Sequence, residues 1–311
     1  MNLLTERRGL IEAALMATLT SIFVIGFLYV PFLSILLIFL PVPFLVLAHR
    51  HGKRAMGLSF IITGIIVGAL TGFINSAILL IIFAPLSFAM GVYICREAPP
   101  YKVIGIGTLL SVISLFAFIQ IVDWVAGVAI IDEILWLLQD VIDHQQQALE
   151  NFELTGISTD ELFSYMAMIL PGMLIVQSLI VAFLNYYMMG AVLKRLGEYG
   201  DELPEFSSFR WPSNIILGSF VIFLLTIVTR WMGIFHGETL VTNITLIFSF
   251  VFFLQGIAFI SFMIKKRGVR KGLRMMILAL IIVISPLLTI VALLGVVDAL
   301  FDVRKLRRAD G

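Results

Sequence analysis

Residues 49–95 read HRHGKRAMGLSFIITGIIVGALTGFINSAILLIIFAPLSFAMGVYIC, a short basic run followed by two long apolar stretches, 55–72 and 74–95. Each stretch has close to the roughly 20 apolar residues that a helix needs to cross the hydrocarbon core of a bilayer. Loops rich in Lys and Arg resist translocation and stay on the cytoplasmic side. This part of the chain therefore predicts two transmembrane helices that follow a cytoplasmic turn.

Apolar stretches of this kind recur along the whole chain. Its 311 residues are 60% hydrophobic and 13% charged, with a mean hydropathy of +1.08. So few polar side chains cannot cover a soluble globule of this length, and lipid is the expected solvent. Candidate spans lie at 9–30, 32–48, 55–72, 74–95, 103–122, 165–193, 215–231, 240–264 and 275–300. The expected fold is an all-α, polytopic transmembrane bundle of eight or nine helices.

Basic residues fall at alternate connections between these spans. They are Arg7 and Arg8, the run 49–54, Arg96 and Lys102, Lys194 and Arg195, and the run 265–274. This alternation predicts a multi-pass protein with a cytoplasmic N-terminus. A ninth crossing at 275–300 would leave the following basic residues outside, against the rule. A re-entrant hairpin at Pro286 is the alternative, and the single crossing is only weakly preferred.

The longest polar segment, 123–164, holds nine acidic residues and no Lys or Arg, and is expected outside. Apolar residues recur in it at helical spacing over 130–142, which predicts an external amphipathic helix. The polar connector 197–212 contains Gly200 and Pro204. We expect it to separate a six-helix membrane domain, 1–196, from a C-terminal membrane region of two or three helices, 213–311.

Two stripes of small residues lie within the predicted spans. One is the pair Ala13 and Ala17, and the other is Gly64, Gly68 and Gly72. Small residues four apart share a helix face and allow a second helix to approach closely. Internal helix packing is the simpler interpretation of both stripes. For Ala13 and Ala17, the alternative is a docking surface for a partner protein.

Polar side chains at membrane depth must find a partner or line a wet cavity. Asn75, Gln120 and Gln177 are placed toward the outer half by the predicted threading. Interhelical hydrogen bonds are the simpler interpretation, and a shared binding cavity for a small polar ligand is the alternative. Glu12, a turn inside the first span, is expected to pair locally with Arg7 and Arg8.

Signatures of catalysis and of metal or nucleotide binding are missing from the sequence. There is no His-Glu-x-x-His motif and no Gly-x-x-x-x-Gly-Lys-Ser/Thr loop. The single cysteine, Cys95, excludes an internal disulfide, and a net charge of +1 does not suggest nucleic-acid binding. We therefore expect no enzyme, no cofactor, no metal site and no nucleic-acid partner.

Two C-terminal stretches resemble a known family. Residues 253–258, FLQGIA, followed by 265–268, KKRG, and residues 294–304, LGVVDALFDVR, are similar to the C-terminal pattern of the YybS family of bacterial predicted membrane proteins. That family has no established activity. The resemblance implies a location in the bacterial cytoplasmic membrane and no particular mechanism.

Residues 1–195 also resemble the substrate-binding S components of energy-coupling-factor transporters. The likeness rests on six helices, a first span with Ala13 and Ala17, and a second span with prolines. It implies docking of the alanine face onto a transmembrane coupling subunit. The expected function is transport-related binding of a small molecule within the first six helices, without an ATPase of its own. The alternative is a membrane scaffold or accessory subunit that binds other envelope proteins.

Overall fold

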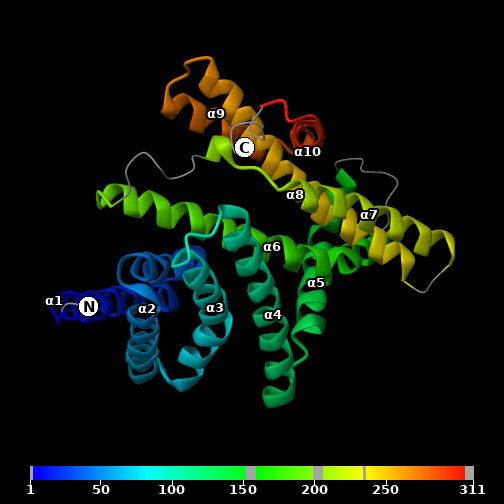
Figure 1. Ribbon diagram of the computed structural model, residues 1–311. Coiled ribbons are helices and arrows are strands. Elements are labelled where there is room, and N and C mark those ends of the chain that lie inside the picture. Colours follow the sequence, from blue (N-terminus) through cyan, green and yellow to red (C-terminus); the bar gives the residue numbers. More distant parts are fainter. Residues whose placement is uncertain (1–2, 152–158, 199–205, 234–235, 305–311) are drawn as a thin grey trace. The chain divides into compact units, whose positions relative to one another are not determined.

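The computed structural model describes residues 3–151, 159–198, 206–233 and 236–304 (Figure 1). Within these ranges every regular element is a helix, which confirms the all-α class. The helices are α1 (Leu3–Tyr29), η1 (Pro31–Phe39), α2 (Pro41–Thr71), α3 (Phe73–Ile94), α4 (Pro100–Ala126), α5 (Ile130–Asn151), α6 (Thr159–Arg195), η2 (Phe206–Ser208), α7 (Ser213–Trp231), α8 (Gly237–Lys266), α9 (Lys271–Val283) and α10 (Ser285–Phe301).

Among the described residues, seven helices are long and apolar enough to cross a membrane, or eight if α9 and α10 together make one span. Their exposed surface is rich in large apolar side chains, such as Leu15 and Ile22 on α1 and Leu217 on α7. Such side chains are stable on a surface that lipid covers. The structure is therefore that of a polytopic helical membrane protein in contact with the bilayer.

The two spans predicted at 32–48 and 55–72 belong to one helical stretch, Phe32–Thr71. It begins as the 3₁₀ helix η1, becomes α-helical at Pro41, and is interrupted at Gly52, whose φ is 80°. A positive φ is accessible to glycine because it has no Cβ. Phe44 and Phe60, which lie eight residues before and after Gly52, stack on each other, so the two halves of this stretch fold back side by side. The loop predicted at 49–54 is therefore a tight turn at Gly52, and the predicted spans 32–48 and 55–72 are two antiparallel helical segments.

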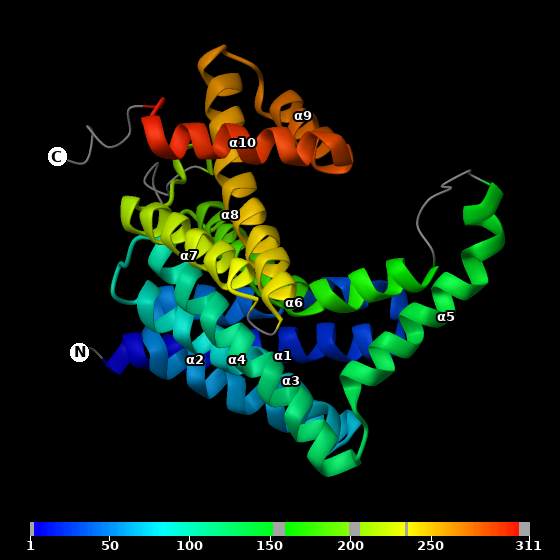
Figure 2. The ribbon, with the colours of Figure 1, turned by 90° about the vertical axis from the view of Figure 1, so that its right-hand side faces the viewer.

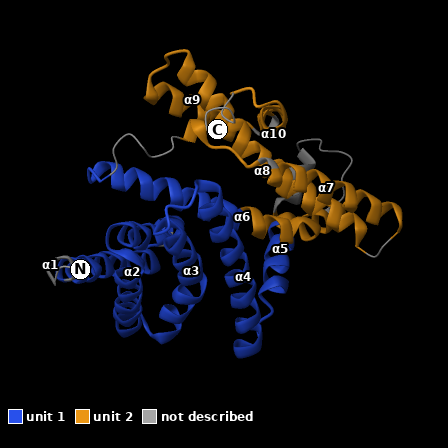
Figure 3. Ribbon diagram, in the orientation of Figure 1, with its two compact units in different colours: residues 1–141, 177–203 blue, residues 142–176, 204–311 orange. Residues whose placement is uncertain are grey.

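The chain divides into two compact units (Figure 3). Unit 1 comprises residues 1–141 and 177–203, and unit 2 comprises residues 142–176 and 204–311. One division lies inside the predicted connector 197–212. The assignment of 142–176 to unit 2 has no counterpart in the sequence pattern, because α5 and α6 are each continuous helices that contribute to both units.

Unit 1 is built from helices that pack in chain order, α1 on α2, α2 on α3 and α3 on α4. The rings of Phe44 and Phe60 stack in its core with centroids 3.7 Å apart. A Cβ atom on Gly107 of α4 would lie 2.7 Å from Cγ of Met90 on α3. The absence of a side chain at Gly107 thus allows the close approach of α3 and α4.

Unit 2 contains a very close helix crossing, between α8 and α10 (Figure 2). A Cβ on Gly256 would lie 1.9 Å from the carbonyl oxygen of Val291, and a Cβ on Gly295 would lie 1.9 Å from that of Phe252. Each glycine therefore faces the backbone of the opposite helix. Only glycine fits at either position, because backbone atoms cannot move aside as a flexible side chain can.

The C-terminal stretch 275–300 does not form one straight span. It is divided between α9, of 13 residues, and α10, of 17 residues, which meet at a bend of 113°. At about 1.5 Å per residue these helices are about 20 and 26 Å long, each shorter than the ~30 Å hydrocarbon core. A pair bent in this way is either one broken span or a re-entrant loop, so both alternatives expected from the sequence stand.

The predicted amphipathic helix is present as α5. Its apolar residues Ile131, Ile134 and Leu135 are half-buried, whereas Asp132 and Glu133 are exposed. This pattern matches the two faces expected from the sequence.

Candidate functional site

The alanine pair on α1 is buried inside unit 1. Ala13 and Ala17 have no exposed surface, and Ala13 packs with Leu47 and Ala55 of α2. Thr63 of α2 donates a hydrogen bond to the carbonyl oxygen of Ala17 at 3.5 Å. This face is therefore a contact between α1 and α2, and it leaves no free surface for a partner protein.

The three glycines Gly64, Gly68 and Gly72 have two different roles. Gly64 and Gly68 face α3, where Ser76 donates a hydrogen bond to the carbonyl oxygen of Gly64 at 2.7 Å. Gly72 instead caps the turn between α2 and α3 with a φ of 99°, and a Cβ there would meet no atom within 4 Å. Grouping Gly72 with the packing residues was wrong. It is a turn residue whose positive φ favours glycine.

The three amides that were candidates for ligand binding do not converge. Asn75 donates a hydrogen bond to the carbonyl oxygen of Thr71, one turn earlier, at 2.8 Å. Gln120 is exposed near the end of α4. Of the three, only Gln177 lines the cavity described next.

That cavity lies within unit 1 and has a volume of about 270 Å³. Its polar lining residues come from three helices: Ser34 of η1, Ser111 of α4, and Gln177 and Ser178 of α6. The remaining lining residues are aliphatic side chains and one phenylalanine, with α3 contributing Leu86. The cavity is therefore partly polar, and no titratable group lines it.

Three of these polar side chains have no hydrogen-bond partner within the described ranges: Ser111, Gln177 and Ser178. Ser178 is 1% exposed, whereas Ser111 is half-buried and Gln177 is exposed. By contrast, the amide of Asn185, on the same helix, donates to the carbonyl oxygens of Ile38 and Val181 at 2.7 Å. Polar groups left unpaired in an apolar environment cost free energy. The cavity thus presents unused donors and acceptors to whatever enters it.

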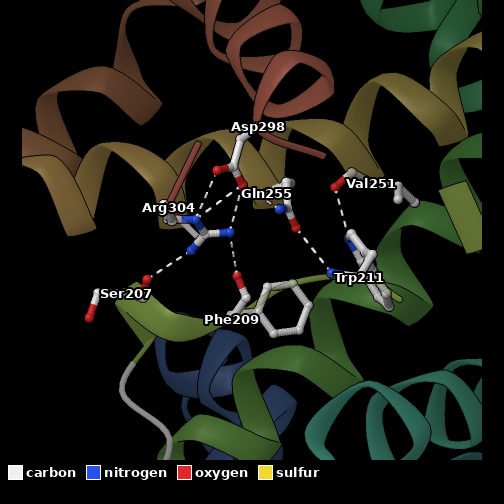
Figure 4. Close-up of polar contacts among 7 residues, drawn as sticks. All are labelled: Ser207, Phe209, Trp211, Val251, Gln255, Asp298 and Arg304. Carbon is white, nitrogen blue, oxygen red and sulfur yellow. Dashed lines mark hydrogen bonds and ion pairs between the residues drawn. The ribbon is translucent and has the colours of Figure 1, made fainter. Parts of the chain in front are cut away.

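Unit 2 holds a buried cluster of polar groups around Asp298 and Arg304 (Figure 4). The guanidinium of Arg304 donates to the carboxylate of Asp298, at 2.7 Å in its shortest contact. It also donates to the carbonyl oxygens of Ser207 and Phe209, at 2.8 and 2.9 Å. These contacts join the chain after α10 to the segment before α7.

Gln255 completes this cluster from α8. Its amide donates to Asp298 at 2.6 Å, and its oxygen accepts a hydrogen bond from the backbone N–H of Trp211 at 3.1 Å. The indole of Trp211 donates to the carbonyl oxygen of Val251. The side chains of Asp298, Gln255 and Arg304 thus bond to other groups of the protein. The cluster stabilises the fold of unit 2.

The ends of helices in unit 1 are joined by a second ionic cluster. Glu12 of α1 lies 2.6 Å from Nη1 of Arg50 and 2.9 Å from Nε2 of His51. Arg50 also pairs with Glu198, which follows α6, at 2.7 Å. The expected local pairing of Glu12 with Arg7 and Arg8 was wrong. The basic run before the Gly52 turn supplies its partners, and sequence proximity could not indicate them.

Comparisons with known proteins also identify the chain as a membrane protein. Residues 18–299 match the family model described as "Predicted membrane protein (DUF2232)". The chain is also 25% identical, over 309 residues, to the "Uncharacterized protein YybS" of Bacillus subtilis (strain 168), covering 96% of this chain and 98% of the relative. No solved structure matches the chain. The resemblance seen in 253–268 and 294–304 is thereby confirmed, and the chain belongs to the DUF2232 family of predicted membrane proteins.

Proposed function

We propose that this integral membrane protein binds a small uncharged molecule in the cavity of unit 1, as a transport-related binding component without its own ATPase. The observation that carries the proposal is the convergence of Ser111, Gln177 and Ser178, all without hydrogen-bond partners in the described chain, on one cavity. A ligand with hydroxyl or amide groups would satisfy them.

The lining restricts the chemistry of that ligand. Because no Asp, Glu, Lys, Arg or His lines the cavity, a charged solute would lack a counter-charge there. A volume of about 270 Å³ is just below the usual range of ligand pockets, roughly 300–1,000 Å³. The proposed ligand is therefore a small neutral molecule with both polar groups and apolar surface.

Binding without chemical conversion is part of the proposal. The cavity offers an amide and hydroxyl groups but no acid, base or activated nucleophile. Within the described ranges there is also no group of three or more His, Cys, Asp and Glu side chains placed to hold a metal ion. An arrangement of this kind orients a solute by hydrogen bonding.

The binding of a cavity ligand can be tested with Gln177→Leu, which removes the amide and keeps an apolar side chain. The full-length protein would be purified in mild detergent and heated with and without a polar metabolite extract from the cells that produced it. We expect the extract to raise the Tm of the wild type and not that of Gln177→Leu. A lost hydrogen bond to a buried ligand lowers affinity roughly tenfold or more.

Gln120→Leu is the matched control, because Gln120, like Gln177, is an exposed amide but lies outside the cavity lining. It should respond to the extract as the wild type does. If the extract fails to stabilise the wild type, or stabilises Gln177→Leu equally, the cavity is not a binding site and the proposal is wrong.

A further inference from the structure

The turn between α8 and α9 concentrates positive charge. Residues 265–274 contain six Lys and Arg residues and no Asp or Glu. Five of the six make no ion pair in the described part of the chain: Lys266, Arg267, Arg270, Lys271 and Arg274. Four of these five are exposed, and Arg274 is half-buried. These side chains are therefore available to an anionic group from outside the described protein.

A large apolar cavity lies in the same unit. Its volume is about 730 Å³, and it is lined by residues from α7, α8, α9 and α10. Phenylalanines dominate the wall, among them Phe220 and Phe223 of α7 and Phe252 and Phe253 of α8. No charged side chain lines it. Such a wall excludes polar solutes and suits a hydrocarbon chain.

Helix α9 connects the basic turn with this cavity. Arg274 lies in its first turn, and Ile282, which lines the cavity, lies in its last. Eight residues separate them, a rise of about 12 Å. On α8, Phe253 precedes Lys266 by a rise of about 20 Å. The hydrocarbon of one bilayer leaflet is roughly 15 Å deep, so the α9 side of the cavity lies at the depth of acyl chains below the basic turn, and its α8 side reaches toward the bilayer midplane and beyond.

We propose that unit 2 binds an anionic phospholipid, with its phosphate at the α8–α9 turn and one acyl chain in the apolar cavity. Basic clusters next to a membrane span attract anionic headgroups. A role of the basic residues in setting the orientation of the helices in the membrane would explain the charge. It would not explain the apolar cavity. An acidic peptide or a nucleic acid would be attracted by the charge and would leave the cavity empty. This site is separate from the cavity in unit 1.

Native mass spectrometry of the full-length protein tests the proposal. The probes are dioleoylphosphatidylglycerol, which is anionic, and dioleoylphosphatidylcholine, which is zwitterionic and has the same chains. We expect the wild type to retain the anionic lipid preferentially. Arg270→Gln/Lys271→Gln should weaken retention of the anionic lipid by roughly 30-fold, because each basic group near the headgroup contributes to attraction. It should leave retention of the zwitterionic lipid nearly unchanged.

Ser249→Phe tests the acyl chain separately. Ser249 lines the cavity and is exposed to it, so a phenyl ring there fills the space that the chain would occupy. Retention of both lipids should fall. Leu224→Phe is the control, because Leu224 is 61% exposed on α7 and does not line the cavity. It should change neither.

Lys53→Gln/Arg54→Gln removes the same charge at the Gly52 turn and should keep the wild-type preference. Equal losses from the two charge variants would mean that any basic turn attracts the lipid. Unchanged retention in Ser249→Phe would mean that no chain enters the cavity. Either result overturns the proposal, and neither bears on the cavity of unit 1.

Discussion

Arg304 and Asp298 form a buried ion pair across one end of α10, with Nη2 2.7 Å from Oδ2 and side chains only 1% and 3% exposed. Arg304 also bonds to the carbonyl oxygens of Ser207 and Phe209, which precede α7. Because α7 and α8 form a helical pair, the start of α7 lies at the same end as the basic turn after α8. The bonds of Arg304 therefore hold the chain after α10 at the same end of unit 2 as the first residue of α9, Lys271.

Replacing Asp298 by leucine should destabilise the protein strongly. The substitution leaves the guanidinium of Arg304 buried without its counter-ion, which costs about 3–5 kcal/mol in comparable buried pairs. We expect Asp298→Leu/Arg304→Leu to lose less stability than the sum of the two single variants. Denaturant unfolding in detergent, arranged as a double-mutant cycle, measures this coupling. Additive losses would show that the two side chains do not stabilise each other.

The helical class and several element bounds could be predicted from the sequence. The span expected at 74–95 is α3, Phe73–Ile94, and the span expected at 215–231 is α7, Ser213–Trp231. Both are continuous apolar stretches with a recognisable boundary, because Gly72 favours the end of the preceding helix and Pro212 favours the start of the next. Hydropathy alone decides such elements, because lipid requires a long apolar surface.

Contacts between distant side chains could not be predicted in this way. Gln255 and Asp298 are 43 residues apart, and no periodicity relates them. Gly256 and Gly295 did give a sequence signal for close helix packing. A glycine in the middle of an apolar helix weakens that helix unless close packing compensates. The grouping of 142–176 with unit 2 depends on tertiary packing alone and left no local pattern.

Alanine at Gly256 or Gly295 should disrupt the crossing of α8 and α10. The added methyl group would overlap a backbone carbonyl oxygen of the opposite helix, so the helices must separate and lose contact. We expect a loss of about 3 kcal/mol in the free energy of unfolding. Gly105→Ala is the control, because a Cβ on that exposed glycine of α4 meets no atom within 4 Å. It should be neutral or stabilise slightly. A Tm for Gly256→Ala equal to that of Gly105→Ala would contradict the close crossing.

Cys95 offers a test of orientation because it is the single cysteine and is exposed just after α3. A membrane-impermeant maleimide should label it in inverted vesicles and not in intact cells. Partial desolvation raises the pKa of the Cys95 thiol, and the thiolate is the reactive form. Labelling should therefore be slow near neutral pH and accelerate as the pH rises. Val128→Cys in a Cys95→Ser background should show the opposite sidedness. Labelling of Cys95 in intact cells would reverse the proposed threading.

A fusion at the C-terminus distinguishes the re-entrant hairpin from a single crossing. If α9 and α10 enter and leave the membrane at the same side, a green fluorescent protein after residue 311 should fluoresce, and alkaline phosphatase at the same place should be inactive. This follows because Arg304 holds the end of α10 at the side of the basic turns, which the positive-inside rule places in the cytoplasm. Fusions after Gly233, which follows α7, provide the control and should show active phosphatase and no fluorescence. Active phosphatase at the C-terminus would instead require 275–300 to cross the membrane once, and it would be incompatible with the bonds from Arg304 to Ser207 and Phe209.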